Sequence, residues 1–126
     1  MITYYTKEGR FNIDNYKNIP YDKLHNPTGP ALILSDGSKQ WWINGQLHRK
    51  KFPAVIWKNG DVEYFNLGNL HREDGPAIIW GDEKYENVEF WIYGEMYSKK
   101  EFMWIKENNI DLKTKKGKTI IKLKFR

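Results

Sequence analysis

One block of sequence is written three times in this chain, and its period restricts the possible folds more than any other feature. A Leu-His pair begins each copy at Leu24, Leu47 and Leu70, so the copies lie 23 residues apart. Self-similarity at a fixed period of this length indicates a repeat architecture, in which each unit packs on its neighbours. The same spacing relates a proline, an alanine and an isoleucine of every copy: Pro30, Pro53 and Pro76; Ala31, Ala54 and Ala77; Ile33, Ile56 and Ile79.

Each copy predicts an antiparallel β-hairpin. Residues 31–34 and 54–57 are short apolar runs rich in branched side chains, and each follows a proline, which is excluded from the middle of a sheet. The runs lead into Asp36-Gly37 and Asn59-Gly60, dipeptides favoured in two-residue type I′ turns because both central residues need a positive φ. The third copy carries a three-residue insertion, so we expect the loop 81–87 to protrude. The chain is expected to turn into the following copy at Asn44-Gly45, Leu67-Gly68 and Tyr93-Gly94.

Other segments are expected to cover the two ends of the repeat block. Residues 1–23 hold aromatic and aliphatic side chains around a glycine, which predicts an imperfect hairpin over the first copy. After the third copy, Ser98 and Glu101 have the spacing of a capping box, and Tyr97 and Phe102 that of a hydrophobic staple. A short helix is therefore expected within residues 98–110.

The positive charge of the chain is concentrated at its C-terminal end. The net charge is +5, and residues 111–126 contain seven Lys or Arg side chains against one Asp. Lys116-Gly117 predicts a turn, and the following apolar residues alternate with basic ones, so a basic β-hairpin is expected over 111–126. Its charges either protect a sheet edge from aggregation or bind nucleic acid or a phosphorylated ligand. The basic residues of this segment are Lys113, Lys115, Lys116, Lys118, Lys122, Lys124 and Arg126.

The expected fold class is mainly β. A chain of 126 residues suits one domain, here residues 1–126, built as an antiparallel β-hairpin repeat. It comprises an N-terminal cap at 1–23, three repeats of 23–26 residues at 24–97, a capping helix at 98–110 and the basic hairpin at 111–126.

The spacing within the copies resembles a known repeat family. Trp42, Gly45 and His48 follow the pattern W-x-x-G-x-x-H, and residues 65–71 and 91–97 repeat it with substitutions. This pattern is similar to MORN repeats, and more closely to the variant "LHR-x-DGPA" repeats found in proteins of bacteriophages and large viruses. The resemblance covers residues 24–97 and implies a MORN-like solenoid of β-hairpins. It departs at the turn, where the copies read "HNPTGPA", "RKKFPA" and "REDGPA".

The repeated histidines, His25, His48 and His71, suggest either chemistry or architecture. Equivalent residues of adjacent hairpins lie two strands apart, roughly 9–10 Å, whereas zinc needs its ligand atoms at about 2 Å. We therefore expect no metal site and no cofactor. Each ring is expected to fix an inter-repeat turn by bonding a backbone carbonyl or a neighbouring carboxylate. The serines lack a nucleophile-elbow context, so the chain is interpreted as non-enzymatic; a hydrolase or transferase that uses one of the histidines is the remaining alternative.

Aromatic side chains are the candidate binding residues of the repeats. Alternation along the strands assigns them to two columns, one on each face of a sheet. A single-layer sheet leaves one column uncovered, which favours binding to a partner protein or association into a homodimer. The resemblance implies that this partner is a host protein, with defence proteins among the candidates. The columns are Trp41, Tyr64 and Phe90 on one face and Trp42, Phe65 and Trp91 on the other.

The sequence also bears on the compartment in which the protein acts. The chain has no cysteine, so disulfides are excluded and nothing indicates an oxidising compartment. The N-terminus lacks the pattern of a secretory signal, and no window approaches eighteen consecutive apolar residues. We therefore expect a protein that does not insert into membranes and acts in the cytoplasm, that of the host if the protein is viral.

Overall fold

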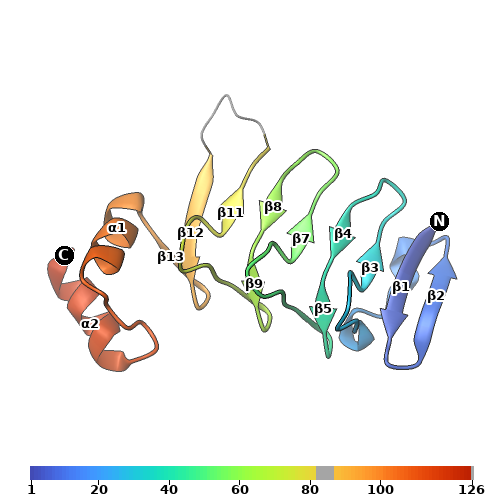
Figure 1. The fold of residues 1–126 in the computed structure, drawn as a ribbon, viewed down its shortest axis with the longest axis horizontal. Coiled ribbons are helices and arrows are strands. Elements are labelled where there is room, and N and C mark those ends of the chain that lie inside the picture. The colour runs from blue at the N-terminus through green and yellow to red at the C-terminus, as the bar shows by residue number, and fades with distance from the viewer. Residues whose placement is uncertain (82–86, 126) are drawn as a thin grey trace.

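The protein is mainly β, with two helices at its C-terminal end. The computed structural model describes residues 1–81 and 87–125, and within these it contains an open nine-stranded antiparallel sheet (Figure 1). The expected protrusion of the loop 81–87 falls largely outside the described residues. The sheet strands are β1 (Ile2–Thr6), β2 (Gly9–Ile13), β3 (Leu32–Ile33), β4 (Lys39–Gln40), β7 (Val55–Ile56), β8 (Val62–Glu63), β11 (Ile78–Ile79), β12 (Val88–Ile92) and β13 (Glu95–Tyr97).

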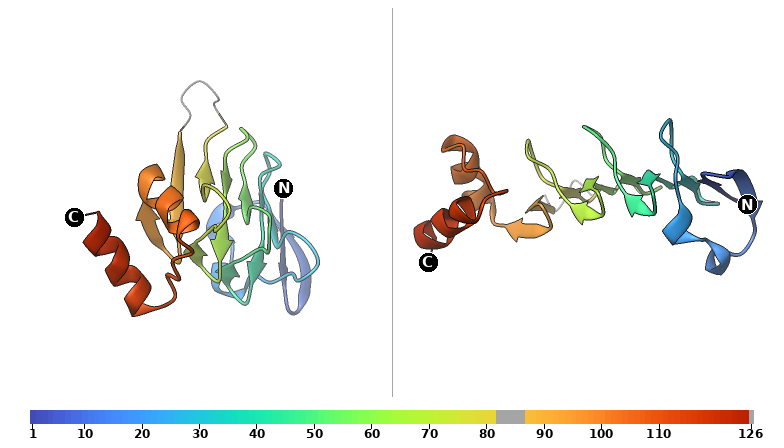
Figure 2. Two further views of the ribbon diagram at one scale, coloured as in Figure 1. Left: turned by 60° about the vertical axis from the view of Figure 1, so that its left-hand side comes forward. Right: turned by 90° about the horizontal axis from the view of Figure 1, so that it is seen from below.

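The strands of successive repeats lie side by side in chain order. The sheet runs β13-β12-β11-β8-β7-β4-β3-β1-β2, so each repeat adds one hairpin to the row. Between repeats, β4 pairs with β7 and β8 pairs with β11, all antiparallel. Seen from below, the row is one layer thick (Figure 2). Two short hairpins lie outside this sheet and are continuous with its strands: β5 (Trp42–Ile43) with β6 (Gln46–Leu47), and β9 (Phe65–Asn66) with β10 (Asn69–Leu70).

Trp41 and Tyr64 mark the point where a strand leaves the large sheet and enters a short hairpin. The amide of Trp41 donates to the carbonyl of Ala54 in the next repeat at 2.7 Å, and its carbonyl accepts from the amide of His48 at 3.0 Å. Tyr64 makes the same two bonds, to Ala77 and His71, at the same distances. Each repeat is therefore joined to the next through backbone hydrogen bonds, which is why the pattern tolerates different aromatic side chains at this position.

The turns differ from the sequence expectation. Asp36-Gly37 belongs to a three-residue loop, because the amide of Leu34 donates to the carbonyl of Ser38 and only Gly37, with φ of 94°, is left-handed. The Asp36 carboxylate accepts from the Ser38 amide at 2.8 Å, an Asx turn that a type I′ turn does not need. Asn59-Gly60 forms the same kind of loop. The two-residue turns with positive φ at both central residues are Asn44-Gly45, Leu67-Gly68 and Tyr93-Gly94.

The N-terminal segment forms the expected hairpin at one end of the row. Strands β1 and β2 pair over their full lengths, and the rings of Tyr4 and Phe11 stack with centroids 5.2 Å apart. Two short 3-10 helices, η1 (Tyr16–Asn18) and η2 (Tyr21–Lys23), follow. Together these elements bury a small cluster made of Ile2, Ile19, Leu24, Ala31 and Leu32.

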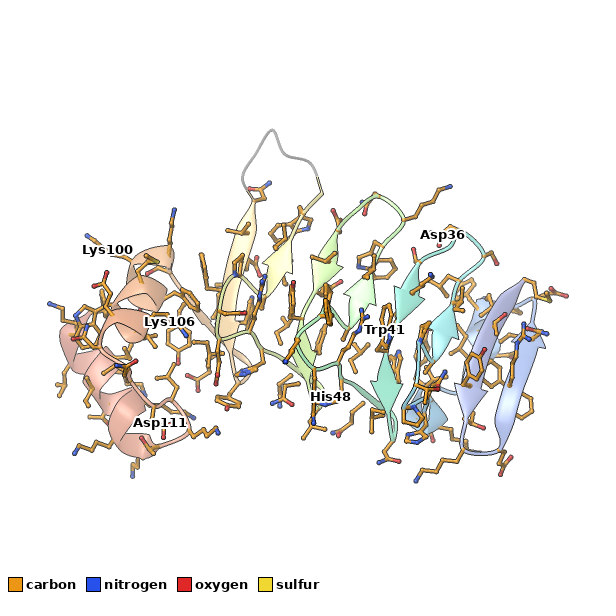
Figure 3. All side chains as sticks on the ribbon, viewed as in Figure 1. Asp36, Trp41, His48, Lys100, Lys106 and Asp111 are labelled. Atoms are coloured by element: carbon orange, nitrogen blue, oxygen red, sulfur yellow. The ribbon has the colours of Figure 1, made fainter. Side chains whose placement is uncertain are left out.

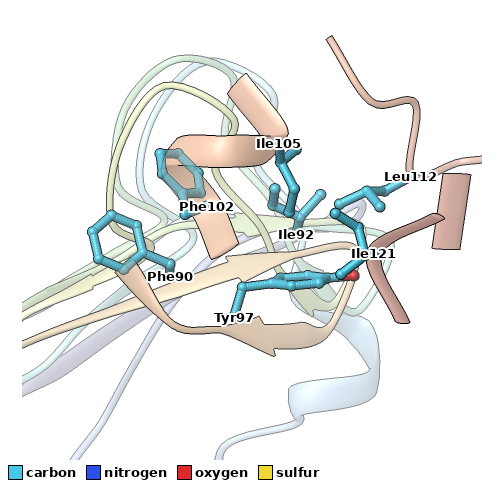
Figure 4. Packing of buried hydrophobic residues seen from close by; sticks show 7 residues of the cluster. All are labelled: Phe90, Ile92, Tyr97, Phe102, Ile105, Leu112 and Ile121. Atoms are coloured by element: carbon cyan, nitrogen blue, oxygen red, sulfur yellow. The ribbon is translucent and has the colours of Figure 1, made fainter. Parts of the chain in front are cut away.

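The expected capping helix is present at the other end as α1 (Lys99–Glu107). Ser98 Oγ accepts from the Glu101 amide at 3.0 Å, and the Glu101 carboxylate accepts from the Ser98 amide at 2.7 Å, which completes the capping box. The helix buries Phe102 and Ile105 against β12 and β13. The larger of the two buried clusters lies here (Figure 4) and consists of Phe90, Ile92, Tyr97, Phe102, Ile105, Leu112 and Ile121.

The prediction of a basic β-hairpin over residues 111–126 is wrong, because the segment contains a second helix, α2 (Lys115–Lys124). Thr114 caps it by accepting from the Gly117 amide at 3.0 Å. The helix buries Gly117 and Ile121, four residues apart, with Phe125 half-buried on the same side. Among the described residues, neither this helix nor any other has the length and apolar character needed to cross a bilayer.

Candidate functional site

The three repeated histidines occupy equivalent positions at the start of their repeats. In each case the ring nitrogen Nδ1 accepts a hydrogen bond from a backbone amide in the turn near the end of the same repeat, where the chain passes into the next one. A bond to a carbonyl or carboxylate was expected from the sequence, so the ring acts as an acceptor where a donor was expected. The bonds join His25 to Asn44 at 3.0 Å, His48 to Leu67 at 3.0 Å and His71 to Tyr93 at 2.9 Å.

This arrangement requires a neutral imidazole whose proton is on Nε2, because a protonated Nδ1 cannot accept. For His71, burial lowers the pKa below its usual value of 6.5, and the nearby Glu73 carboxylate, with Nε2 at 3.7 Å, partly opposes that effect. The ring of His71 also packs on Tyr93, with centroids 4.1 Å apart. Within the described residues, no group of three His, Asp or Glu side chains is placed to hold a metal ion. The geometry thus assigns the histidines to turn fixation.

The first aromatic column is covered by other side chains of the protein. The guanidinium carbon of Arg49 lies 3.8 Å from the centre of the Trp41 ring, and that of Arg72 lies 4.1 Å from the Tyr64 ring. Phe90 is buried and packs against Phe102 of α1, with centroids 4.6 Å apart. Figure 3 shows Trp41 within the row of strands. This column is therefore a stack of arginine and aromatic side chains, and its rings are half-buried or buried.

The second column is half-buried as well. The indole N–H groups of Trp42 and Trp91 each donate at 2.9 Å, to the side chains of Gln40 and Glu89 on the same strand run. Tyr21 of η2 covers Trp42, with ring centroids 5.7 Å apart. Phe65 is half-buried in β9. Neither column thus forms the continuous exposed aromatic face that the sequence analysis expected.

The arginines that follow two of the histidines make hydrogen bonds that were not predicted from the sequence. Arg49 and Arg72 each donate from Nη1 to a proline carbonyl four residues ahead, Pro53 or Pro76, at 3.1 Å. Asn26 makes the equivalent bond to Pro30, also at 3.1 Å. The signal was present in the motif itself, since the residue after each repeated histidine is a long or branched hydrogen-bond donor.

A groove of about 510 Å³ lies between the turns of the second and third repeats. Tyr64 and Phe65 line it, and both were expected to bind a partner. Its lining also includes the arginines of the two turns and Lys106, which Figure 3 labels on α1. Five cationic side chains and two carboxylates line this groove: Arg49, Lys50, Lys51, Arg72 and Lys106 against Glu73 and Asp74.

The charges of the groove are unevenly paired. Arg72 Nε donates to Asp74 at 2.9 Å, and this bond lowers the pKa of the Asp74 carboxyl below its usual value. Among the described residues, no carboxylate lies within ion-pair distance of Arg49. Burial lowers the pKa of the Arg49 guanidinium, because it is partly desolvated without a counter-charge. An anion in the groove would offset that cost.

The six basic C-terminal residues that the structure describes lie on and before α2 and do not line the groove. Lys118 pairs with Glu95 at 3.6 Å, and Lys124 lies 5.8 Å from the Trp104 ring. Lys113 precedes the helix, while Arg126 lies outside the described residues. The side chains of Lys115, Lys116 and Lys122 are exposed.

No family model matches this chain, and comparisons with the curated proteins and with the solved structures return no significant match.

Proposed function

We propose that the protein is a non-enzymatic binding module that holds a partner protein in the groove between its second and third repeats. The observation that carries the proposal is the groove itself, which combines half-buried aromatic rings with a surplus of cationic side chains. Aromatic and arginine side chains are the types most enriched where binding energy is concentrated in protein interfaces. The excess positive charge favours a partner surface that is acidic.

We also infer that the chain is a MORN-like repeat protein and that its hairpins form a solenoid. Supporting this are the histidine bonds that recur in each repeat and the backbone bonds that recur between successive repeats. The similarity of "LHR-x-DGPA" to repeats of bacteriophage and large-virus proteins makes a host protein the proposed partner, and a defence protein a candidate for inhibition. A homodimer remains part of the proposal, although the covered aromatic columns favour the groove over a self-associating aromatic face.

A second candidate function is the binding of nucleic acid or a phosphorylated ligand by α2. The exposed lysines of that helix, Lys115, Lys116 and Lys122, favour it. Such contacts neutralise phosphates and release counterions, so affinity would fall steeply with salt.

Capture of binding partners from host lysate, with the full-length wild type and two full-length variants as baits, separates the two functions. Truncation after Ile110 is unsuitable, because it would remove Leu112 and Ile121 from the buried cluster. A groove variant, Lys51→Glu with Lys106→Glu, and a helix variant, Lys115→Glu with Lys122→Glu, instead carry the same change of charge. All four side chains are exposed, so folding is expected to be retained.

The proposed function predicts one recurrent protein that is lost with the groove variant and kept with the helix variant. Nucleic acid recovered by the wild type and lost only with the helix variant would establish the second function. If the wild type and both variants recover the same proteins, neither surface is the binding site and the proposal fails.

A further inference from the structure

The turns that follow the repeated histidines differ in the hydrogen-bond partners that they offer to the side chain of their first residue. We name them by repeat: the first-repeat turn (Asn26–Gly29), the second-repeat turn (Arg49–Phe52) and the third-repeat turn (Arg72–Gly75). In the first, Asn26 Oδ1 accepts from the amide and the hydroxyl of Thr28, both at 3.1 Å. In the third, Arg72 Nε donates to Asp74 at 2.9 Å. Asn26 accepts and Arg72 donates, but in both turns the first side chain bonds the residue two positions later and so closes the turn internally.

The second-repeat turn has no such side-chain closure; its backbone takes a different path, with φ of 66° at Lys51 and the Phe52 amide donating to the Lys50 carbonyl at 2.8 Å. Lys51 stands where the first and third turns have Thr28 and Asp74, and it cannot accept a hydrogen bond from a guanidinium. The one side-chain bond of Arg49 within the described residues runs from Nη1 to the Pro53 carbonyl. The guanidinium carbon of Arg49 lies 3.8 Å from the centre of a Trp41 ring and 5.0 Å from the centre of the Phe52 ring. Arg49 is therefore oriented like Arg72 but lacks its carboxylate.

We propose that the second-repeat turn is a carboxylate-binding site, and that an acidic segment of the partner protein places an Asp or Glu side chain against Arg49 as Asp74 lies against Arg72. The inference rests on the proposed function, because it names the chemistry that the groove recognises. Guanidinium and carboxylate match in a bidentate geometry, and a guanidinium already fixed by stacking loses little entropy on binding. The exposed Lys50 and Lys51 add attraction without competing for Arg49.

The rest of the groove favours an acidic peptide over a nucleic acid. Phe52 is 58% exposed beside Arg49, so the site offers an apolar contact next to the ion pair. On the opposite side, Glu73 and Asp74 carry negative charge into the same groove. A polyanion with a phosphate at every nucleotide would be repelled there. A peptide meets Glu73 and Asp74 with its backbone amides and Arg49 with one side chain.

The internal repeat supplies the test. The double variant Lys51→Asp with Phe52→Gly rewrites "RKKFPA" as "RKDGPA" and so restores the Asp-Gly pair of the third-repeat turn. It is expected to replace the positive φ of residue 51 by the backbone of that turn and to give Arg49 its own carboxylate. The matched control, Lys50→Glu with Phe52→Gly, has the same change of net charge and the same loss of the ring. The probe is a fluorescein-labelled peptide of alternating aspartate and serine, followed by anisotropy with the full-length protein.

The Lys51→Asp double variant is expected to lose about tenfold more affinity than the control, whose own loss measures what Lys50 and Phe52 contribute. The Arg49 Nε–Hε signal in ¹⁵N NMR should shift when peptide is added to the wild type. In the Lys51→Asp double variant it should already lie near the Arg72 signal without peptide. Asp74→Lys should free Arg72 and raise the stoichiometry from one peptide to two.

Equal losses in the two double variants would overturn the proposal, because bulk charge would then account for binding. A single-stranded oligonucleotide that displaces the peptide and shifts the Arg49 Nε–Hε signal would overturn it in favour of phosphate. If the groove variant loses the captured partner while the two double variants bind the peptide alike, the proposed function stands and the carboxylate assignment falls. If capture is unaffected by the groove variant, the proposed function itself fails.

Discussion

The substitution His48→Ala tests whether the repeated histidines fix the turns that lead from one repeat into the next. The change removes the acceptor of the Leu67 amide, which lies 3.0 Å from Nδ1, and leaves the remainder of the turn in place. A neutral hydrogen bond contributes about 1 kcal/mol net. Leu67 is 52% exposed, so water can reach its freed amide, and no further penalty for a buried unsatisfied donor is expected. We expect the free energy of unfolding to fall by about 1 kcal/mol, which lowers Tm by about 4 °C in a chain of this size.

Urea denaturation and amide hydrogen exchange measure this effect together. Exchange of the Leu67 amide should accelerate in His48→Ala, whereas the amides of Asn44 and Tyr93, bound by the other two histidines, report any general loosening. His48→Asn is the control, because its side-chain oxygen restores an acceptor close to the position of Nδ1. An alanine variant as stable as the wild type, with unchanged exchange at Leu67, would refute the assigned role of the ring.

Three further outcomes follow from the same contacts. The pKa of His71 is lowered in the folded protein, mainly by burial, so the unfolded chain binds more protons below pH 6.5. The urea midpoint should therefore be constant above pH 6.5 and fall as the pH drops through the folded-state pKa. In His71→Asn this fall should be weaker. Ile121→Ala, in the cluster under α2, should cost about 3 kcal/mol in urea denaturation, while the exposed Lys122→Ala leaves stability unchanged. Thr114→Ala removes the cap of α2 and should lower stability by about 1 kcal/mol, an effect that Thr114→Ser restores.

Features that depend on local geometry were predicted well from the sequence. The period of 23 residues, the strand-forming runs and the N-terminal hairpin all appear in the sheet, because alternation and turn residues act over a few neighbouring positions. The capping box at Ser98 and Glu101 was confirmed for the same reason. The type of each turn was not predictable from its dipeptide. The Asp36 side chain binds the backbone two residues ahead and holds the loop at three residues.

The C-terminal helix was missed because two periodicities coexist in the same residues. Ile121, Leu123 and Phe125 alternate with lysines, which favours a strand, but Leu123 is 62% exposed and the buried positions are Gly117 and Ile121. The spacing of four between these two, after Thr114 as a capping residue, was the signal for a helix. A Cβ at position 117 would overlap the carbonyl of Asp111, so glycine is required for close approach here, although the sequence analysis interpreted it as a turn.

The candidate site was predicted in part, and the reason lies in how each repeat covers the aromatic ring of the repeat before it. Alternation correctly assigned Trp41 and Tyr64 to equivalent places, but it could not show that Arg49 and Arg72, eight residues further on, fold back over the rings. Once each ring is covered by an arginine of the next repeat, an aromatic column no longer distinguishes a binding face from a structural one. What distinguishes the second repeat is its departure from the pattern, since a lysine replaces the group that elsewhere closes the turn. Where the other turns close with a side-chain hydrogen bond of their own, the turn that lacks this bond is the one at which an external ligand gains the most binding energy.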